Sequence, residues 1–222
     1  MASNRENPLL LAVDAGSPTV SVAVGYGNKI LAERAAQIAR SSGNLLRLVD
    51  DALAAADRTI QQVEGLLGLR GPGSFTGLRV GLATLLGLHQ AVAIPATAIP
   101  TFDVLASLAP GKEGIVLAAV DALRDRWLVQ PFRPGDPPRT LAPPQNLTAD
   151  RLTDLKPDLV IGFGVSRLAG SKSRGETNRL VEPPPLAASA IRLTLARELK
   201  WDTAILLDPL YLQPLSYKPL GK

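Results

Sequence analysis

Three short segments near the start of the chain carry the hydrophobic pattern of β-strands. Residues 9–13 are apolar without interruption, which is typical of a buried strand. Residues 19–24 alternate and are rich in β-branched side chains, and residues 29–35 resume the pattern after a glycine-rich turn at 25–28. Tight turns between consecutive strands predict that a sheet begins in antiparallel fashion.

Helical periodicity follows these strands. Ser41 or Ser42 can cap a helix in which apolar residues recur every three or four positions, and this helix is expected to end near Asp57. A glycine-rich loop precedes a second helix, which is expected to run to about Val92. Two further strands and a short helix complete this part, at residues 65–69, 94–99 and 101–108.

A break at residues 110–114 separates these elements from a reduced second set. Its strands and helix are expected at residues 115–120, 127–132, 158–163 and 186–199, followed by a short extended tail at 208–212. Six prolines between residues 131 and 146 exclude a helix or a central strand, so this stretch is expected to be an exposed connector. The order of elements predicts an α/β protein with two lobes, residues 1–110 and 111–222.

Composition excludes several kinds of catalytic site. The chain has no cysteine and one histidine, so thiolate zinc sites, cysteine nucleophiles and the two-histidine zincin motif are excluded. The single histidine, His89, lies in an apolar stretch and is interpreted as a partly buried helix residue. The formal charge of +4 falls on residues 151–222. Few aromatic residues accompany this charge, so a mildly basic solvated surface is preferred to an RNA-binding platform.

The sequence lacks membrane and export signals. No apolar run approaches the roughly 20 residues that a membrane helix needs. The polar start and the short apolar run after it do not have the pattern of a signal peptide. We therefore expect a cytoplasmic protein, and the residues give no reason to expect a bound metal or cofactor.

The most specific segment is Arg70-Gly71-Pro72-Gly73-Ser74-Phe75-Thr76-Gly77-Leu78-Arg79, between a predicted strand and a predicted helix. Its glycines permit positive φ and close backbone approach, and positive φ is expected at Gly73. Ser74 or Thr76 can cap the helix, whose free N–H groups form an anion site. The segment predicts either a phosphate-binding loop or a rigid strand-to-helix turn. It is not a Walker loop, because no lysine follows the last glycine.

Residues 71–79 resemble, without interruption, the GPGSFTGLR signature of the TsaB (YeaZ) family. Other segments agree with the family in order, at residues 11–14, 45–46, 94–95 and 208–212. The last of these is similar to the family's terminal Pro-x-Tyr-Leu pattern. The resemblance covers roughly residues 9–125 well and the second lobe weakly.

This resemblance implies the actin/sugar-kinase/Hsp70-like (ASKHA) fold with a degenerate second lobe. It implies a non-catalytic subunit of the bacterial complex that forms N6-threonylcarbamoyladenosine at position 37 of tRNA. The implied partners are a TsaD-type transferase subunit, a TsaE-type ATPase and, through the complex, tRNA, with a homodimer when the chain is alone. The family is often labelled peptidase M22-like, but this sequence has no residues for a peptidase.

A second motif, Asp-Ala-Gly-Ser at residues 14–17, follows the first predicted strand and resembles the phosphate turn of ASKHA kinases. A full nucleotide site needs a second such turn, but residues 121–123 are Asp-Ala-Leu, with leucine in place of glycine. The segment 121–126 also departs from the family's Asp-Ala-Arg followed by glycine. A tight turn, or a vestigial phosphate turn, is therefore the interpretation of Asp14, Gly16 and Ser17.

The two predicted helices of the first lobe carry apolar and small residues. Glycine inside a helix costs about 1 kcal/mol relative to alanine, so glycines at 77, 81 and 87 favour close approach of another backbone. That backbone belongs either to strands of the same lobe or to a partner, since the resemblance implies association through paired helices. The predicted partner-binding residues are Leu45, Leu48, Val49, Ala52, Gly77, Leu78, Gly81, Leu82 and Leu85.

The sequence is compatible with three functions: an interaction subunit, an ATP-dependent small-molecule kinase of the same fold superfamily, and an RNA-binding module. The missing second phosphate turn favours the first over the second. The scarcity of aromatic residues and of clustered basic residues weighs against the third.

Overall fold

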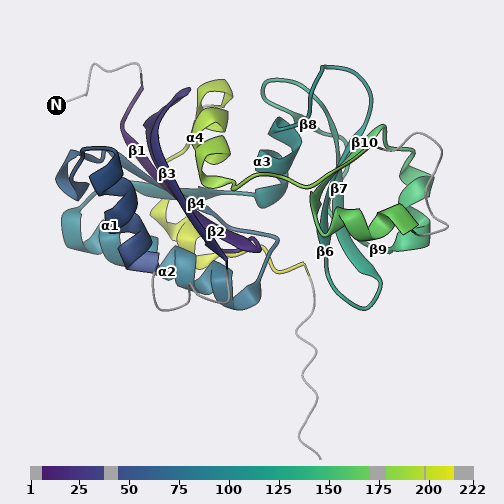
Figure 1. Cartoon of the computed structure of the whole chain (residues 1–222), viewed down its shortest axis with the longest axis horizontal. Helices are drawn as coiled ribbons and strands as arrows, with labels where there is room; N and C mark the ends of the chain where they lie inside the picture. The colour runs from purple at the N-terminus through teal and green to yellow at the C-terminus, as the bar shows by residue number, and fades with distance from the viewer. Residues whose placement is uncertain (1–6, 38–44, 171–178, 198, 213–222) are drawn as a thin grey trace, which may run out of the picture.

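A computed structural model describes residues 7–37, 45–170, 179–197 and 199–212 of the 222-residue chain. Two lobes lie side by side, each built on one β-sheet (Figure 1). The two serines predicted to cap the first helix, Ser41 and Ser42, lie outside the described residues.

The first sheet has the strand order β3-β2-β1-β4-β5. Its strands are β1 (Leu10–Asp14), β2 (Thr19–Tyr26), β3 (Lys29–Gln37), β4 (Gly65–Leu69) and β5 (Ala96–Ile99). The predicted antiparallel start is confirmed, because β2 pairs antiparallel with both β1 and β3, while β4 runs parallel to β1. As the central strand, β1 is covered on both faces, which explains its uninterrupted apolar sequence.

Helices α1 (Leu45–Ala55) and α2 (Phe75–Val92) cover one face of this sheet, and α4 (Ala187–Ala196) covers the other (Figure 1). The first amides of α4 bond to polar side chains of the sheet: Ala187 N donates to Ser21 Oγ over 3.1 Å, and Ala188 N donates to Glu33 Oε1 over 3.0 Å. The later part of the chain therefore completes the first lobe. The expected division at residue 110 stays a prediction.

The second sheet repeats the topology of the first in reduced form. Its order is β11-β10-β6-β7-β8, with β9 also paired to β7. As in the first sheet, the central strand β6 runs antiparallel to the next strand along the chain and parallel to β10. The strands are β6 (Val116–Asp121), β7 (Arg126–Arg133), β8 (Arg139–Thr140), β9 (Gln145–Thr148), β10 (Leu159–Phe163) and β11 (Arg179–Val181).

Short 3-10 segments stand where the first lobe has its long helices. Segment η3 (Ala149–Leu155) precedes β10, as α1 precedes β4, and η4 (Val165–Gly170) follows β10, as α2 follows β4. Two more such segments, η2 (Ile60–Gln62) and η5 (Thr203–Leu207), lie in the first lobe, the latter against β5 and α2. The order of elements therefore shows a duplicated architecture with a degenerate second copy.

The proline-rich stretch 131–146 departs from the expected exposed connector. Pro131 is buried within β7, and both β8 and β9 pair with that strand. Proline lacks an N–H but keeps its carbonyl. The carbonyl of Pro131 accepts a hydrogen bond of 2.9 Å from the amide of Leu141. The prediction of a connector is therefore wrong at β8 and β9, whereas the strand predicted at residues 127–132, which includes Pro131, is confirmed as β7.

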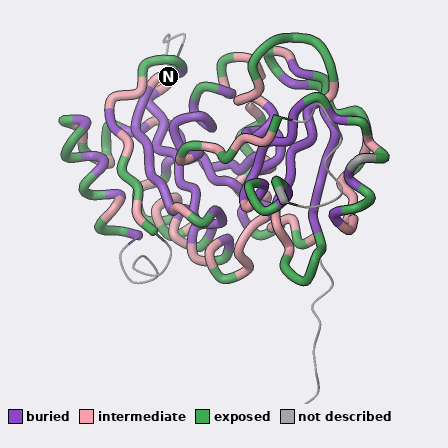
Figure 2. The backbone as a smooth tube through the Cα atoms, turned by 45° about the vertical axis from the view of Figure 1, so that its right-hand side comes forward, coloured by how far each residue is buried: buried purple, intermediate pink, exposed green. Residues whose placement is uncertain are grey.

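The buried residues form a core that joins the two lobes (Figure 2). One cluster includes residues of both sheets together with α4 and α3 (Thr101–Ser107), and Phe102 and Phe132 are fully buried in it. A second cluster lies under α1 and α2, and a third lies between the second sheet and its 3-10 segments. Among the described helices, none has both the length and the hydrophobicity required to span a bilayer.

Candidate functional site

The signature segment lies at the carboxyl end of β4 and opens α2. Of the two predicted capping residues, Ser74 is the one used: its Oγ accepts a hydrogen bond of 3.2 Å from Gly77 N. Positive φ occurs at Gly71 (φ +107°) and not at Gly73, so the expectation for Gly73 is wrong. The side chains of Arg70 and Arg79 contact the C-terminal residues Asp208 and Tyr211.

The turn between β1 and β2 packs directly on this segment. Ser74 N donates to Gly16 O over 2.7 Å. A Cβ added to Gly73 would lie 2.5 Å from the same carbonyl oxygen, and one added to Gly77 would lie 1.9 Å from Ala15 O. Close packing inside the lobe therefore accounts for the glycines at 73 and 77. This is the rigid strand-to-helix turn that the spacing left open.

Asp14 is buried at the centre of this corner. Its Oδ1 accepts hydrogen bonds from Gly16 N (3.0 Å) and Ser17 N (3.2 Å). Burial raises the pKa of Asp14 to about 6, and the neighbouring Ser17 and Gly16 only partly oppose this effect. Within the part of the chain that the structure describes, the other carboxylate oxygen, Oδ2, and the buried Ser17 Oγ have no hydrogen-bond partner. The two turn amides that a phosphate would require are thus bonded to Asp14 itself.

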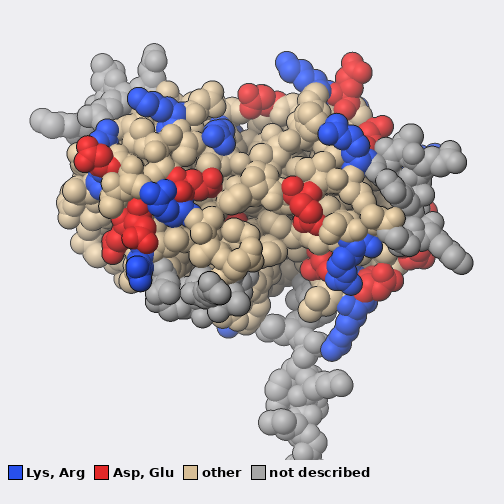
Figure 3. Space-filling view, in the orientation of Figure 1, with Lys and Arg blue, Asp and Glu red and all other residues tan. Residues whose placement is uncertain are grey.

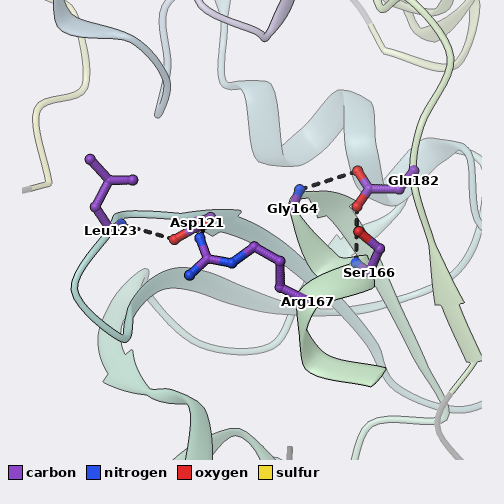
Figure 4. Close-up of polar contacts among 6 residues, drawn as sticks. All are labelled: Asp121, Leu123, Gly164, Ser166, Arg167 and Glu182. Atoms are coloured by element: carbon purple, nitrogen blue, oxygen red, sulfur yellow. Dashed lines mark hydrogen bonds and ion pairs between the residues drawn. The ribbon is translucent and has the colours of Figure 1, made fainter. Parts of the chain in front are cut away.

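The corresponding turn of the second lobe follows β6. Asp121 Oδ1 accepts a hydrogen bond of 2.9 Å from Leu123 N, two residues on, as Asp14 does from Gly16. Leu123, Arg124 and Asp125 all have positive φ, at 65°, 51° and 59°. Left-handed backbone is costly for residues other than glycine, so these three residues place strain in the turn. Arg167 of η4 forms an ion pair with the other carboxylate oxygen of Asp121, Oδ2 (Figure 4).

A second acidic side chain holds the neighbouring turn, which follows β10. The Glu182 carboxylate accepts hydrogen bonds from Gly164 N (3.1 Å) and Ser166 N (2.9 Å), one through each oxygen (Figure 4). At both turns of the second lobe, backbone amides therefore donate to the chain's own carboxylates, Asp121 and Glu182. No spacing in the sequence indicated Arg167 or Glu182.

Most of the predicted partner-binding side chains belong to the core of the first lobe. Seven of the nine are buried: Leu45, Val49, Ala52, Leu78, Gly81, Leu82 and Leu85. Leu48 and Gly77 are half-buried. A buried side chain offers a partner no surface, so this set is revised. A partner surface on these helices has to be formed by their outward positions.

The outward positions of α2 are small and almost free of charge. Thr76, Ala83, Gly87, Gln90 and Ala91 are exposed, and Arg79 is the only lysine, arginine, aspartate or glutamate of the helix. A Cβ added to Gly87 would meet no atom of the described residues within 4 Å. On the neighbouring α1, the side chain of Leu46 is 59% exposed. These positions form the surface that we call the α2 face.

The remaining polar candidate, His89, has a structural role at the end of α2. Nδ1 of the His89 ring lies 2.7 Å from Ile94 O, just beyond the end of α2. The residue is half-buried, as predicted. Within the described part of the chain, no group of three or more His, Asp or Glu side chains is arranged to hold a metal ion.

Comparison with known proteins places this arrangement in a family. The family model described as "TsaD: tRNA N6-adenosine threonylcarbamoyltransferase" matches residues 34–155. The tRNA threonylcarbamoyladenosine biosynthesis protein TsaB of Haemophilus influenzae is 35% identical over 120 residues, which cover 53% of this chain and 50% of that protein. The chain belongs to the TsaB (YeaZ) family. It spans about half the length of the curated TsaB relatives from H. influenzae and Escherichia coli.

Solved structures extend the similarity of this TsaB-family chain over both lobes. YeaZ from Pseudomonas aeruginosa is 26% identical, with a TM-score of 0.68, and the match covers 85% of this chain and 90% of that one. A P. aeruginosa protein described as similar to peptidase YeaZ has a TM-score of 0.77 at 24% identity, covering 93% and 100%. The predicted two-lobed ASKHA fold with a degenerate second lobe is confirmed.

Proposed function

We propose that the chain is a non-catalytic subunit of the complex that forms N6-threonylcarbamoyladenosine in tRNA. In this role it binds and supports a TsaD-type transferase subunit. The names of its TsaB relatives support the pathway, and the outward surface of α2 supports a role in binding. A TsaE-type ATPase and tRNA then meet the chain within the complex.

The contacts at both phosphate-type turns support the non-catalytic role. A kinase of this fold holds nucleotide phosphates between two turns, one in each lobe. Here the first turn directs its amides at Asp14, and the second has Asp121 paired with Arg167. A nucleotide would have to displace these internal bonds. This observation disfavours the alternative function, an ATP-dependent small-molecule kinase.

The α2 face carries the proposal for the partner surface. An exposed helix face with little charge loses little hydration when a partner covers it, and interface cores are depleted of charged residues. Among the described residues, no atom lies within 4 Å of a Cβ added to Gly87, and this glycine costs its helix about 1 kcal/mol relative to alanine. Contact with a second backbone explains why that position is small. We expect the same face to support a homodimer when the transferase is absent.

The surface charges give an RNA-binding module no comparable support. On the face shown in Figure 3, lysine and arginine side chains are interspersed with aspartate and glutamate over both lobes. Arg70, Arg151 and Arg167 each form an ion pair with an aspartate. Phosphate binding requires unpaired basic side chains gathered in one patch.

A charge placed on the α2 face tests the proposal. Ala83→Glu should abolish co-purification with the TsaD-type subunit, because a carboxylate would be desolvated in the interface, and it should leave the melting temperature nearly unchanged. Ala169→Glu is the matched control, since Ala169 is also exposed but lies on η4 in the second lobe. Unchanged co-purification of the Ala83→Glu chain would place the partner surface elsewhere.

A further inference from the structure

The C-terminal residues 208–212 lie across the signature segment, about 140 positions away in the sequence. Arg70 Nη1 forms an ion pair of 3.1 Å with Asp208, and the carbonyl of Arg70 accepts a hydrogen bond of 2.7 Å from Leu210 N. A Cβ added to Gly71 would lie 3.0 Å from Leu210 O. The first glycine of the signature thus leaves room for the C-terminal segment.

An aromatic contact extends this docking to the first turn of α2. The ring centroids of Phe75 and Tyr211 are 4.8 Å apart, and Cζ of the Arg79 guanidinium lies 3.8 Å from the centroid of the Phe75 ring. Arg79 Nε also donates a hydrogen bond of 3.0 Å to Tyr211 Oη. Loop and helix therefore each contact the segment through a separate set of groups.

The two sides of this contact are unequally anchored. The side chain of Arg70 is 18% exposed, whereas that of its partner Asp208 is 78% exposed. Tyr211 is 39% exposed. Segments with few buried contacts open locally at low free energy, before the rest of the fold. Residues 208–212 are therefore the partner in this contact that can detach from the signature segment.

We propose that residues 208–212 form a strap whose docking fixes the signature segment and the first turn of α2, and whose release frees them while both sheets stay folded. Arg70 holds its backbone through hydrogen bonds with Asp208 and Leu210, Gly71 leaves room for it, and Phe75 with Arg79 holds Tyr211. The α2 face lies on the helix whose first turn the strap contacts, so release of the strap would alter partner binding. This consequence rests on the proposed function.

Hydrogen exchange of the full-length chain, measured by mass spectrometry without any partner, tests the strap. In Tyr211→Ala, amides of residues 70–79 should exchange about tenfold faster than in the wild type, because both aromatic and arginine contacts are lost. Tyr211→Phe keeps the ring contact and should stay within about threefold of the wild type. Amides of β1 and β2 should be unchanged in both variants.

Leu207→Ala is the matched control, because Leu207 immediately precedes the strap and is 70% exposed. It should leave exchange in residues 70–79 as in the wild type. The strap is overturned if Tyr211→Ala changes this exchange by less than about twofold. It is also overturned if β1 and β2 accelerate equally or the variant does not fold, since the segment would then belong to the global fold. Failure of the proposed function leaves these measurements unaffected.

Discussion

The buried carboxyl of Asp14 should make the stability of this chain depend on pH in an unusual direction. Burial raises its folded-state pKa from 3.8 to about 6. The folded state therefore binds this proton more tightly than the unfolded state does. The stabilisation it gives is present below about pH 4 and is lost as the pH rises through about 6.

The size of this effect follows from the two pKa values. They differ by about two pH units, and each unit corresponds to about 1.4 kcal/mol, so the full effect is about 3 kcal/mol. Asp14→Asn removes the titration and keeps the size of the side chain. Relative to this variant, the free energy of unfolding of the wild type should fall by about 3 kcal/mol between about pH 4 and pH 7.

Urea denaturation of wild type and variant across this range measures the difference directly. Replacing the carboxyl group with an amide shifts the free energy of unfolding by the same amount at every pH. The result is therefore read from how the difference between wild type and variant changes with pH. Asp50→Asn is the control, because Asp50 lies on the exposed side of α1. If the gap between wild type and Asp14→Asn stays constant within about 0.5 kcal/mol, the argument from burial is refuted.

Two further predictions concern backbone fit, and both are measured as free energies of unfolding. Gly77→Ala should destabilise the chain by about 1–3 kcal/mol, because its Cβ would meet Ala15 O, whereas Gly87→Ala on the same helix should stabilise it by about 0.5–1 kcal/mol. Equal effects of the two substitutions would contradict the packing described here. Leu123→Gly should raise stability by roughly 0.5–1 kcal/mol, since it relieves left-handed backbone at an exposed position, and a loss of stability would show that the turn is unstrained.

Local pattern was enough to predict most elements of the fold. The apolar run at residues 9–13 marked a strand covered on both faces, and the nine-residue signature marked the start of α2. Strands β8 and β9 within the proline-rich stretch were missed because propensity treats each proline alike. Pro131 keeps its carbonyl in the ladder, a property of register that composition does not record.

Sequence patterns could not predict the long-range contacts. Helical periodicity identified an apolar stripe at Leu45, Val49 and Ala52, but periodicity does not say whether a sheet or a partner covers it. The docking of Tyr211 on Phe75 and the pairing of Arg167 with Asp121 depend on how distant segments meet. The revised partner surface therefore came from burial and not from hydrophobicity.

The N6-threonylcarbamoyladenosine content of tRNA, measured by mass spectrometry after depletion of this chain from its native cells, tests the proposed role most directly. The modification should fall on depletion and be restored by the wild type and by Asp14→Asn, because the subunit needs no chemistry at that turn. Ala83→Glu should fail to restore it. Unchanged modification after depletion would contradict the proposed function, and failure of a folded Asp14→Asn chain to restore it would contradict the non-catalytic role.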